Sequence, residues 1–191
     1  LQKATILAED HRFVNHFGVD PIGISRAMIK NVQSGHIVEG GSTLTQQVAK
    51  KTFLTDKKTF ERKFQEMFIA LGIESKNSKS KILEMYLNVV PYGPRVNGVE
   101  VASQVYFHKK PAQLTEAESL VLAFLPRDPV DLSKTTQIRD WLGDCSGKTF
   151  FCTPFVDPDY QYSSLEKLLF QLADQEQWSL AQTQKVWFEL A

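Results

Sequence analysis

Two adjacent acids, Glu9 and Asp10, open the stretch of this sequence whose residue types are best suited to chemistry. Glu9 follows a short apolar run, and the partial burial expected there raises the pKa of a carboxylate toward the range useful for proton transfer. Asp10, Phe13 and His16 recur at three-residue spacing, which brings an acid, a ring and an imidazole to one side of a helical turn. Taken alone, the stretch is better explained as a solvated helix end with a charged cap.

A glycine-rich loop leads into a second candidate segment, residues 40–51. Thr43 and Gln46 have the spacing of a capping box, so a helix is expected to begin there. Free N–H groups and the positive dipole end of such a helix favour an anion. Thr43, Gln47 and Lys50 fall at i, i+4 and i+7, which places a hydroxyl, an amide and an ammonium on one stripe. A capped amphipathic helix with a wet face would show the same pattern.

An aromatic stripe marks the next expected helix, residues 59–74. Such a stripe more often forms core than lipid contact, and we expect core here. On another face Arg62 and Glu66 are spaced i, i+4. They form either a surface ion pair worth ~0.3–0.5 kcal/mol or a second catalytic carboxylate held by a guanidinium. The stripe consists of Phe60, Phe64, Met67, Phe68 and Leu71.

The remaining segments predict an all-α protein. Capping residues and helical periodicity predict helices over about 21–34, 78–88, 98–107, 116–125, 164–174 and 179–190. The Pro-Tyr-Gly-Pro sequence at 91–94 predicts a turn. Helical periodicity is lost between residues 134 and 162, where we expect an irregular insertion.

Composition limits the classes of function. With 191 residues, 42% of them hydrophobic, the chain can form one domain with a sizeable core. Its 22 basic and 22 acidic residues balance, so no global field favours nucleic acid. No apolar run approaches the ~18 residues of a membrane helix. Because the chain opens on Leu1 rather than Met, we expect a fragment from which an anchor or leader could have been removed.

Five stretches, in order, resemble the peptidoglycan glycosyltransferase domain (family 51) of class A penicillin-binding proteins and monofunctional transglycosylases. The spacing between Glu9 and Glu66 agrees as well, and the last two helices are similar to the pair that closes this domain. The resemblance implies a mainly helical, lysozyme-like fold with a small membrane-facing jaw that includes residues 53–68. The insertion at 134–162 is the main departure. The matching stretches are residues 9–20, 40–50, 62–66, 81–88 and 98–107.

The resemblance also implies an activity, the inverting transfer of a glycan chain from a polyprenyl pyrophosphate to the 4-hydroxyl of lipid II. Glu9 matches the general base of the family and Glu66 its second essential glutamate. The implied partners are lipid II, the growing glycan chain, the membrane surface on the extracytoplasmic side of the bacterial inner membrane, and other cell-wall synthesis proteins. Some members use a divalent cation, Mg²⁺ or Mn²⁺. The implied substrate-binding residues are Asp10, Phe13, His16, Thr43, Gln46, Gln47, Lys50, Arg62 and Lys63.

Two other classes of function stay open. A lysozyme-like hydrolase or lytic transglycosylase would cleave glycan, but it needs no pyrophosphate clamp, so Lys50, Arg62 and Lys63 count against it. A non-catalytic domain that binds lipid II or partner proteins is the other alternative. The presence of both Glu9 and Glu66 argues against it, whereas an insertion that blocks the groove would favour it.

Two further expectations concern single segments. Phe53 and Leu54 precede the polar and basic residues 55–58, an arrangement suited to a lipid headgroup boundary. Given the extracytoplasmic location implied by the resemblance, Cys145 and Cys152 form either a disulfide across a short loop or two free thiols.

Overall fold

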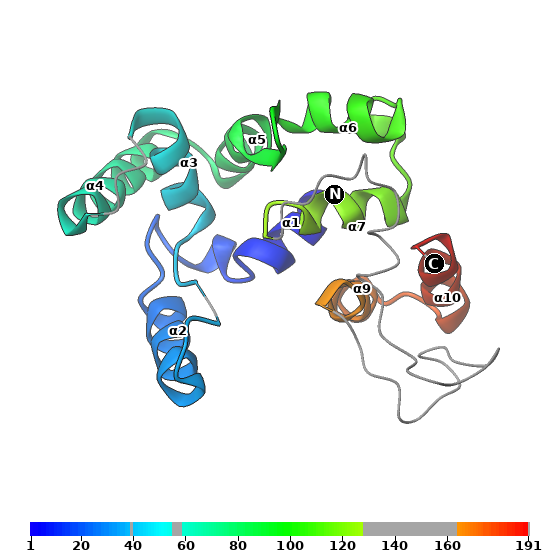
Figure 1. Ribbon diagram of the computed structural model, residues 1–191, viewed down its shortest axis with the longest axis horizontal. Helices are drawn as coiled ribbons and strands as arrows, with labels where there is room; N and C mark the ends of the chain where they lie inside the picture. Colours follow the sequence, from blue (N-terminus) through cyan, green and yellow to red (C-terminus); the bar gives the residue numbers. More distant parts are fainter. Residues whose placement is uncertain (39, 55–58, 128–163, 191) are drawn as a thin grey trace. The chain divides into compact units, whose positions relative to one another are not determined.

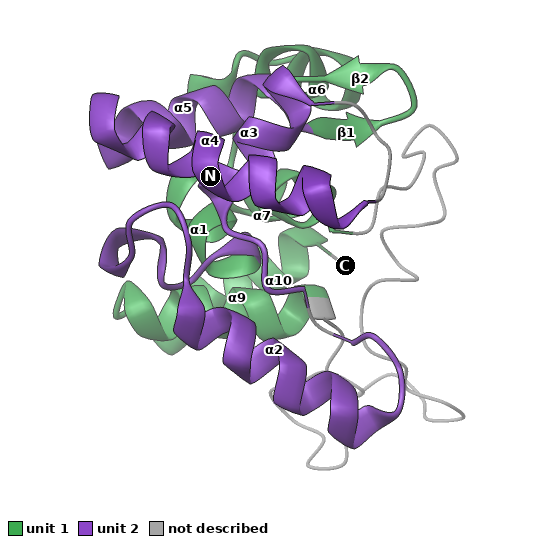
Figure 2. Ribbon diagram, turned by 90° about the vertical axis from the view of Figure 1, so that its left-hand side faces the viewer, with its two compact units in different colours: residues 1–8, 91–191 green, residues 9–90 purple. Residues whose placement is uncertain are grey.

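The computed structural model describes residues 1–38, 40–54, 59–127 and 164–190 (Figure 1). In this part of the chain helices dominate, which confirms the expected all-α class. The chain divides into two compact units, residues 9–90 and residues 1–8 with 91–191 (Figure 2). The whole of the expected insertion, with Cys145 and Cys152, lies outside the described residues. None of the described helices is both long and apolar enough to cross a bilayer.

The 9–90 unit contains all of the candidate site residues, and its helices begin where the sequence predicted. Asp20, Thr43, Thr59 and Ser78 are the N-caps, and the side chain of each accepts a hydrogen bond from a backbone N–H of the first helical turn. A single turn of 3₁₀ helix, η1 (Phe13–Asn15), precedes them. The helices are α2 (Pro21–Ser34), α3 (Leu44–Phe53), α4 (Phe60–Lys76) and α5 (Lys79–Val89).

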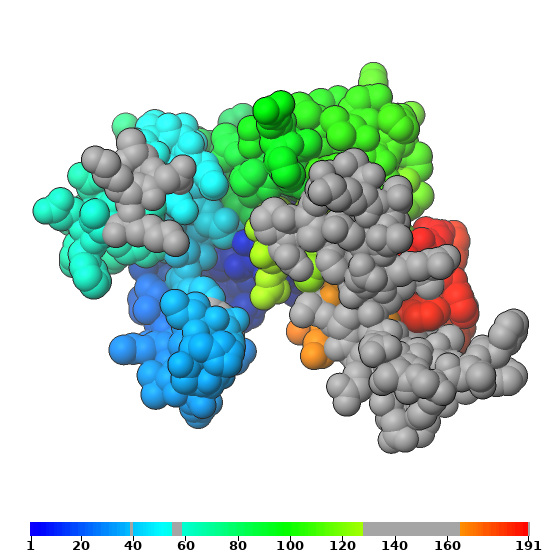
Figure 3. Space-filling view, viewed as in Figure 1, coloured from blue at the N-terminus to red at the C-terminus, as the bar shows by residue number. Residues whose placement is uncertain are grey.

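The core of this unit lies where α3 packs against both α4 and α5. Leu44 and Val48 of α3 and Ile82 of α5 are fully buried there. In contrast, α2 buries only Gly23 and Ala27, and it stands out as a separate projection of the unit (blue in Figure 3). The core of the unit is therefore formed by α3, α4 and α5, and α2 contributes little to it.

The expectation that the aromatic stripe of α4 forms core is wrong. Phe60, Phe64 and Phe68 are 89%, 60% and 73% exposed. The buried face of α4 instead contains Glu66 together with Ala70 and other residues. The helical period shows which residues share a face, but the partner helices decide which face is buried. Here the small and charged side of α4 is buried.

The second unit begins with most of α1 (Gln2–Glu9) and continues after residue 90. The turn expected at residues 91–94 proves to be part of a β-hairpin, in which β1 (Pro91–Gly93) pairs antiparallel with β2 (Val96–Asn97). Strands this short carry no alternating pattern that the sequence could reveal. The other elements are α6 (Val99–Phe107), η2 (Pro111–Gln113), α7 (Glu116–Phe124), α9 (Ser164–Gln175) and α10 (Leu180–Leu190).

The expected pair of closing helices is present. α10 packs against α7 and α9. The indole of Trp187 in α10 donates a 2.7 Å hydrogen bond to the buried carboxylate of Glu166 in α9. A capping box of Thr115 and Glu118 starts α7 at the place where a helix was expected.

Candidate active site

Glu9 is the last residue of α1 and is half-buried. The side-chain amide of Gln47, in the first turn of α3, donates a 2.8 Å hydrogen bond to its Oε2 atom. The capping box predicted for Thr43 and Gln46 is present and defines where α3 begins. The position of Gln47, and with it the orientation of the Glu9 carboxylate, thus follows from the start of α3.

Asp10 ties the turn after α1 to the same helix. Its Oδ2 atom accepts a 3.0 Å hydrogen bond from the backbone N–H of Leu44, the first residue of α3, and lies 2.9 Å from Nε2 of His16. The ring of Phe13 packs edge-on to His16 with centroids 6.1 Å apart. The three residues spaced at i, i+3 and i+6 do meet, as predicted. Asp10 and Phe13 are buried.

Two of the N–H groups expected to bind a substrate anion at the start of α3 are used within the chain. Leu44 donates to Asp10 and Gln46 donates to the Thr43 hydroxyl. That hydroxyl donates in turn to the carbonyl of Gly18 at 2.6 Å. The carboxylate of Asp10 therefore sits at the positive end of the α3 dipole, where the sequence suggested a bound anion. Thr43 and Gln46 are 2% and 1% exposed.

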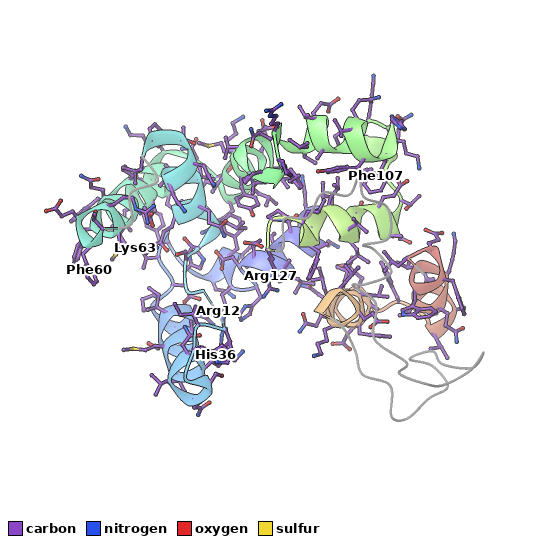
Figure 4. All side chains as sticks on the ribbon, in the orientation of Figure 1. Arg12, His36, Phe60, Lys63, Phe107 and Arg127 are labelled. Atoms are coloured by element: carbon purple, nitrogen blue, oxygen red, sulfur yellow. The ribbon has the colours of Figure 1, made fainter. Side chains whose placement is uncertain are left out.

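The second cluster is built on α4 around Glu66, whose side chain is 3% exposed. Lys63 Nζ lies 2.9 Å from its Oε2 atom and also donates to the hydroxyl of Ser42 at 2.6 Å. Arg62 Nη1 lies 3.3 Å from Glu66 Oε1, and its side chain is only 15% exposed. The alternative of a surface ion pair is therefore wrong for Arg62 and Glu66, because both side chains are largely buried. Lys63 lies at the N-terminal end of α4 (Figure 4).

The guanidinium of Arg62 retains unused donors. Its Nε and Nη1 atoms are buried and have no hydrogen-bond partner in the described part of the chain, since the contact with Glu66 lacks hydrogen-bond geometry. The ammonium group of Lys50, three residues after Gln47 and half-buried, likewise forms no hydrogen bond or ion pair with the described residues. Guanidinium and ammonium donors of this kind are suited to phosphate oxygens.

An open groove of about 790 Å³ adjoins this cluster. Lys63 and Ser42 line it together with Met67 of α4. The rest of its wall comes mostly from α2 and the segment after it, and is largely apolar. The groove thus joins a cationic group to a hydrophobic surface. The residues of that wall are Ile24, Ala27, Met28, Asn31, Val32, Gly35, His36, Ile37 and Gly41.

Contacts of charged groups also connect the residues before η1 with those after it. Burial alone would raise the pKa of Asp20, but the N–H of Gly23 and the Arg12 guanidinium outweigh it and hold that pKa below its ordinary value of 3.8. Arg12 Nε lies 3.1 Å from Asp20 Oδ2. Burial lowers the pKa of His11, and Arg26, whose Nη1 lies 2.8 Å from its ring, lowers it further. The lowered pKa values favour a charged Asp20 after η1 and a neutral His11 before it.

The described residues do not form a protein-built metal site. No group of three or more His, Cys, Asp or Glu side chains in them could hold a metal ion. The acids of the site are instead engaged by Gln47, His16, Lys63 and Arg62. The divalent cation that the family resemblance implies stays a prediction.

Sequence reasoning had assigned no role to Ser42, although it lies in the glycine-rich loop that had been singled out. Its hydroxyl contacts Lys63 from a position 21 residues away in the sequence, and no periodic pattern links the two. Glu74 and Lys79, which form a part-buried ion pair at 2.7 Å, were missed for a similar reason. The break between α4 and α5 separates them.

The helical fold and the two acidic centres can be compared with known proteins. The family model for transglycosylases matches residues 1–143, and the chain belongs to that transglycosylase family. It is 50% identical over 129 residues to penicillin-binding protein 1A of Neisseria gonorrhoeae, covering 68% of this chain and 16% of that protein.

Two other penicillin-binding proteins match this chain to a similar extent. Penicillin-binding protein 1A of Aquifex aeolicus is 48% identical over 126 residues, which cover 66% of this chain and 17% of the relative. Penicillin-binding protein 1A of Pseudomonas aeruginosa is 43% identical over 145 residues, which cover 73% and 18%. The chain thus spans less than a fifth of the length of these curated relatives.

Proposed function

We propose that this chain is a peptidoglycan glycosyltransferase that polymerises lipid II. One observation carries the proposal. Gln47 donates a hydrogen bond to Glu9, and Ser42 accepts one from Lys63 of the Arg62–Lys63–Glu66 cluster. Gln47 and Ser42 belong to the same short segment of the chain. A candidate base and a candidate pyrophosphate site are thereby held by residues only five positions apart in the sequence.

Glu9 acts as the general base in this proposal. As the acceptor 4-hydroxyl attacks the anomeric carbon of the donor, its proton passes to the Glu9 carboxylate. The bond from the anomeric carbon to the pyrophosphate oxygen breaks, and the electron pair leaves with the pyrophosphate, so the configuration inverts. The hydrogen bond from Gln47 favours the ionised carboxylate, which is the form that can accept a proton.

The cationic cluster stabilises the leaving group. Arg62, with two unused buried donors, and Lys50, with no partner among the described residues, supply charge-assisted hydrogen bonds to pyrophosphate oxygens. Glu66 contacts both Arg62 and Lys63 and keeps their charged groups in place.

The lipid part of the donor would meet the apolar surfaces of the same unit. The groove beside Lys63 and the exposed ring stripe of α4 both offer apolar area. We therefore propose that the protein works at the extracytoplasmic face of the inner membrane on lipid II and the growing glycan chain, together with other cell-wall synthesis proteins. A glycan-cleaving enzyme would have no use for the open guanidinium donors of Arg62.

Incubation of the purified protein with labelled lipid II tests the proposal. Polymer that forms in the wild type and is lost in Glu9→Gln supports it. Release of fragments from preformed glycan would identify the cleaving alternative. Binding of lipid II with no product in either assay would identify a non-catalytic domain.

A further inference from the structure

The ammonium group of Lys79, the first residue of α5, has contacts that its helix does not need. A cation at the N-terminal end of a helix opposes the helix dipole, so the stability of α5 does not account for it. We propose that Lys79 is a positioning residue for the glycosyl transfer proposed above, on which this inference rests. It acts through Phe13 and His16 on the turn that carries Glu9 and Asp10.

Lys79 holds the turn at two points. Its Nζ atom donates a 2.6 Å hydrogen bond to the backbone carbonyl of His16. The same atom lies 4.5 Å from the centroid of the Phe13 ring, within the range of a cation–π interaction. One ammonium group thus fixes both ends of the four-residue segment that begins at Phe13.

Hydrogen bonds connect this segment, residues 13–16, to Asp10 and so to the neighbouring Glu9. Phe13 N–H donates to the Asp10 carbonyl at 2.8 Å, and the Asp10 carboxylate contacts the His16 ring and the N–H of Leu44. Glu9 is the preceding residue. A shift of Phe13 or His16 therefore moves Asp10, and with it the backbone that sets where Glu9 points.

Glu74 keeps Lys79 in place. Its Oε1 atom accepts hydrogen bonds from Lys79 and from the hydroxyl of Thr45, both at 2.7 Å. The Glu74 side chain is 3% exposed and that of Lys79 27% exposed. Thr45 belongs to α3, Glu74 to α4 and Lys79 to α5. The hydrogen bonds among these three side chains, with the one from Lys79 to His16, therefore connect the three core helices to the turn.

The turn also lies directly against α4. Gly18 has φ +78°, and a Cβ atom there would lie 3.0 Å from the backbone of Ala70 and 3.2 Å from Cγ of Glu74. Such an approach is open only to glycine. The turn therefore contacts α4 at Gly18, directly beside the Glu74 side chain that pairs with Lys79.

Lys79→Met in the full chain tests the role. We expect kcat for polymerisation of lipid II to fall about 10- to 100-fold, the loss typical of a misplaced catalytic group, with KM changed by less than about twofold. Lys81→Met is the matched control. Lys81 lies on the same helix, but it forms an exposed pair with Glu84, and its loss should leave kcat unchanged.

A double variant separates positioning from stability. Lys79→Met alone leaves the Glu74 charge buried without its partner, which lowers the melting temperature. Glu74→Gln with Lys79→Met removes both charges, so the melting temperature should recover while kcat stays low. Recovery of kcat together with the melting temperature, or normal kcat in Lys79→Met, would overturn the proposal.

Hydrogen exchange gives a readout that does not depend on activity. The Leu44 N–H is bonded to Asp10, so its protection should fall in Lys79→Met and stay low in the double variant, while interior amides of α5 keep theirs. Unchanged Leu44 protection would also overturn the positioning role. A wild type that makes no polymer would refute the proposed function, and the Leu44 amide would still decide whether Lys79 holds the turn.

Discussion

Gln47 Nε2 and Glu9 Oε2 lie 2.8 Å apart, joined by a hydrogen bond between residues 38 positions apart in the sequence. The amide N–H donates and the carboxyl oxygen accepts, and an ionised carboxylate is the stronger acceptor. It also makes the direction of that carboxylate depend on the first turn of α3. The proposed base is thus oriented by a helix whose own start is defined by a capping box.

Replacement of Glu9 by glutamine should abolish base catalysis and preserve shape. We expect turnover to fall by ~10²–10⁴, as is typical when a general base is lost, while the affinity for a pyrophosphate-bearing donor analogue persists. Polymerisation rate and analogue affinity are measured on the same preparation. Glu84→Gln, which changes an exposed acid on α5, serves as control. Near-normal polymerisation by Glu9→Gln would contradict the mechanism.

Glu66→Gln should lower both the polymerisation rate and the affinity for the pyrophosphate-bearing donor analogue. Lys63 and Arg62 lose the carboxylate that lies 2.9 and 3.3 Å from them, so their charges no longer converge on the pyrophosphate. We expect slower turnover and at least severalfold weaker binding of the analogue, measured as for Glu9→Gln. If the two variants lost analogue binding equally, the division of labour between Glu9 and Glu66 would be wrong.

Exposed apolar residues near the start of α4 should promote membrane binding. Phe53 is 59% exposed at the end of α3, and Phe60 is 89% exposed. Phe53→Ser with Leu54→Ser should weaken sedimentation with anionic liposomes and slow polymerisation, because apolar area is lost from the interface. The matched control is Val101→Ser with Val105→Ser, an exposed pair on α6. Equal liposome binding in both double variants would mean that residues 53–54 are ordinary surface.

Asp20 should make stability depend on pH in acid. Its pKa is lower in the folded chain than its ordinary value of 3.8, so its contribution is fully present above about pH 4. The contribution is lost as pH falls through the folded pKa. Asp20→Asn can still cap α2 but loses the charge that pairs with Arg12.

Urea unfolding of wild type and Asp20→Asn between about pH 2.5 and 7 measures this effect. At neutral pH the variant should be less stable by roughly 1–3 kcal/mol, the cost of losing a charged hydrogen-bond partner. The difference should shrink below about pH 4. Parallel curves for the two proteins over the whole range would show that the Asp20 charge does not contribute.

Helix starts in this chain could be predicted because each is encoded locally. Thr43 with Gln46 and Thr115 with Glu118 are capping boxes within four residues of sequence, and both are present. Which helical face is buried could not be predicted for α4. Its aromatic stripe is the more hydrophobic face, yet α3 and α5 cover the side that contains Glu66.

The sequence named candidate residues for the site, but it could not give the contacts between them. Motif spacing identified Glu9, Asp10 and Glu66, and the structure brings each into a network of polar contacts. The occupant of the α3 N-terminus was missed, because the anion there is Asp10 of the chain itself. Contacts such as Lys63 with Ser42 join separate elements, and only the folded chain defines them.

The small buried surface of α2 has a consequence for mutation. Because only Gly23 and Ala27 are buried, most of its large apolar side chains contribute little to the free energy of unfolding. Met28, Ile29 and Val32 are 67%, 58% and 75% exposed. Polar replacements at these three positions should therefore change the free energy of unfolding very little in a stability screen. Any selective pressure that keeps them apolar must arise from molecules that the chain meets, and not from its own folding.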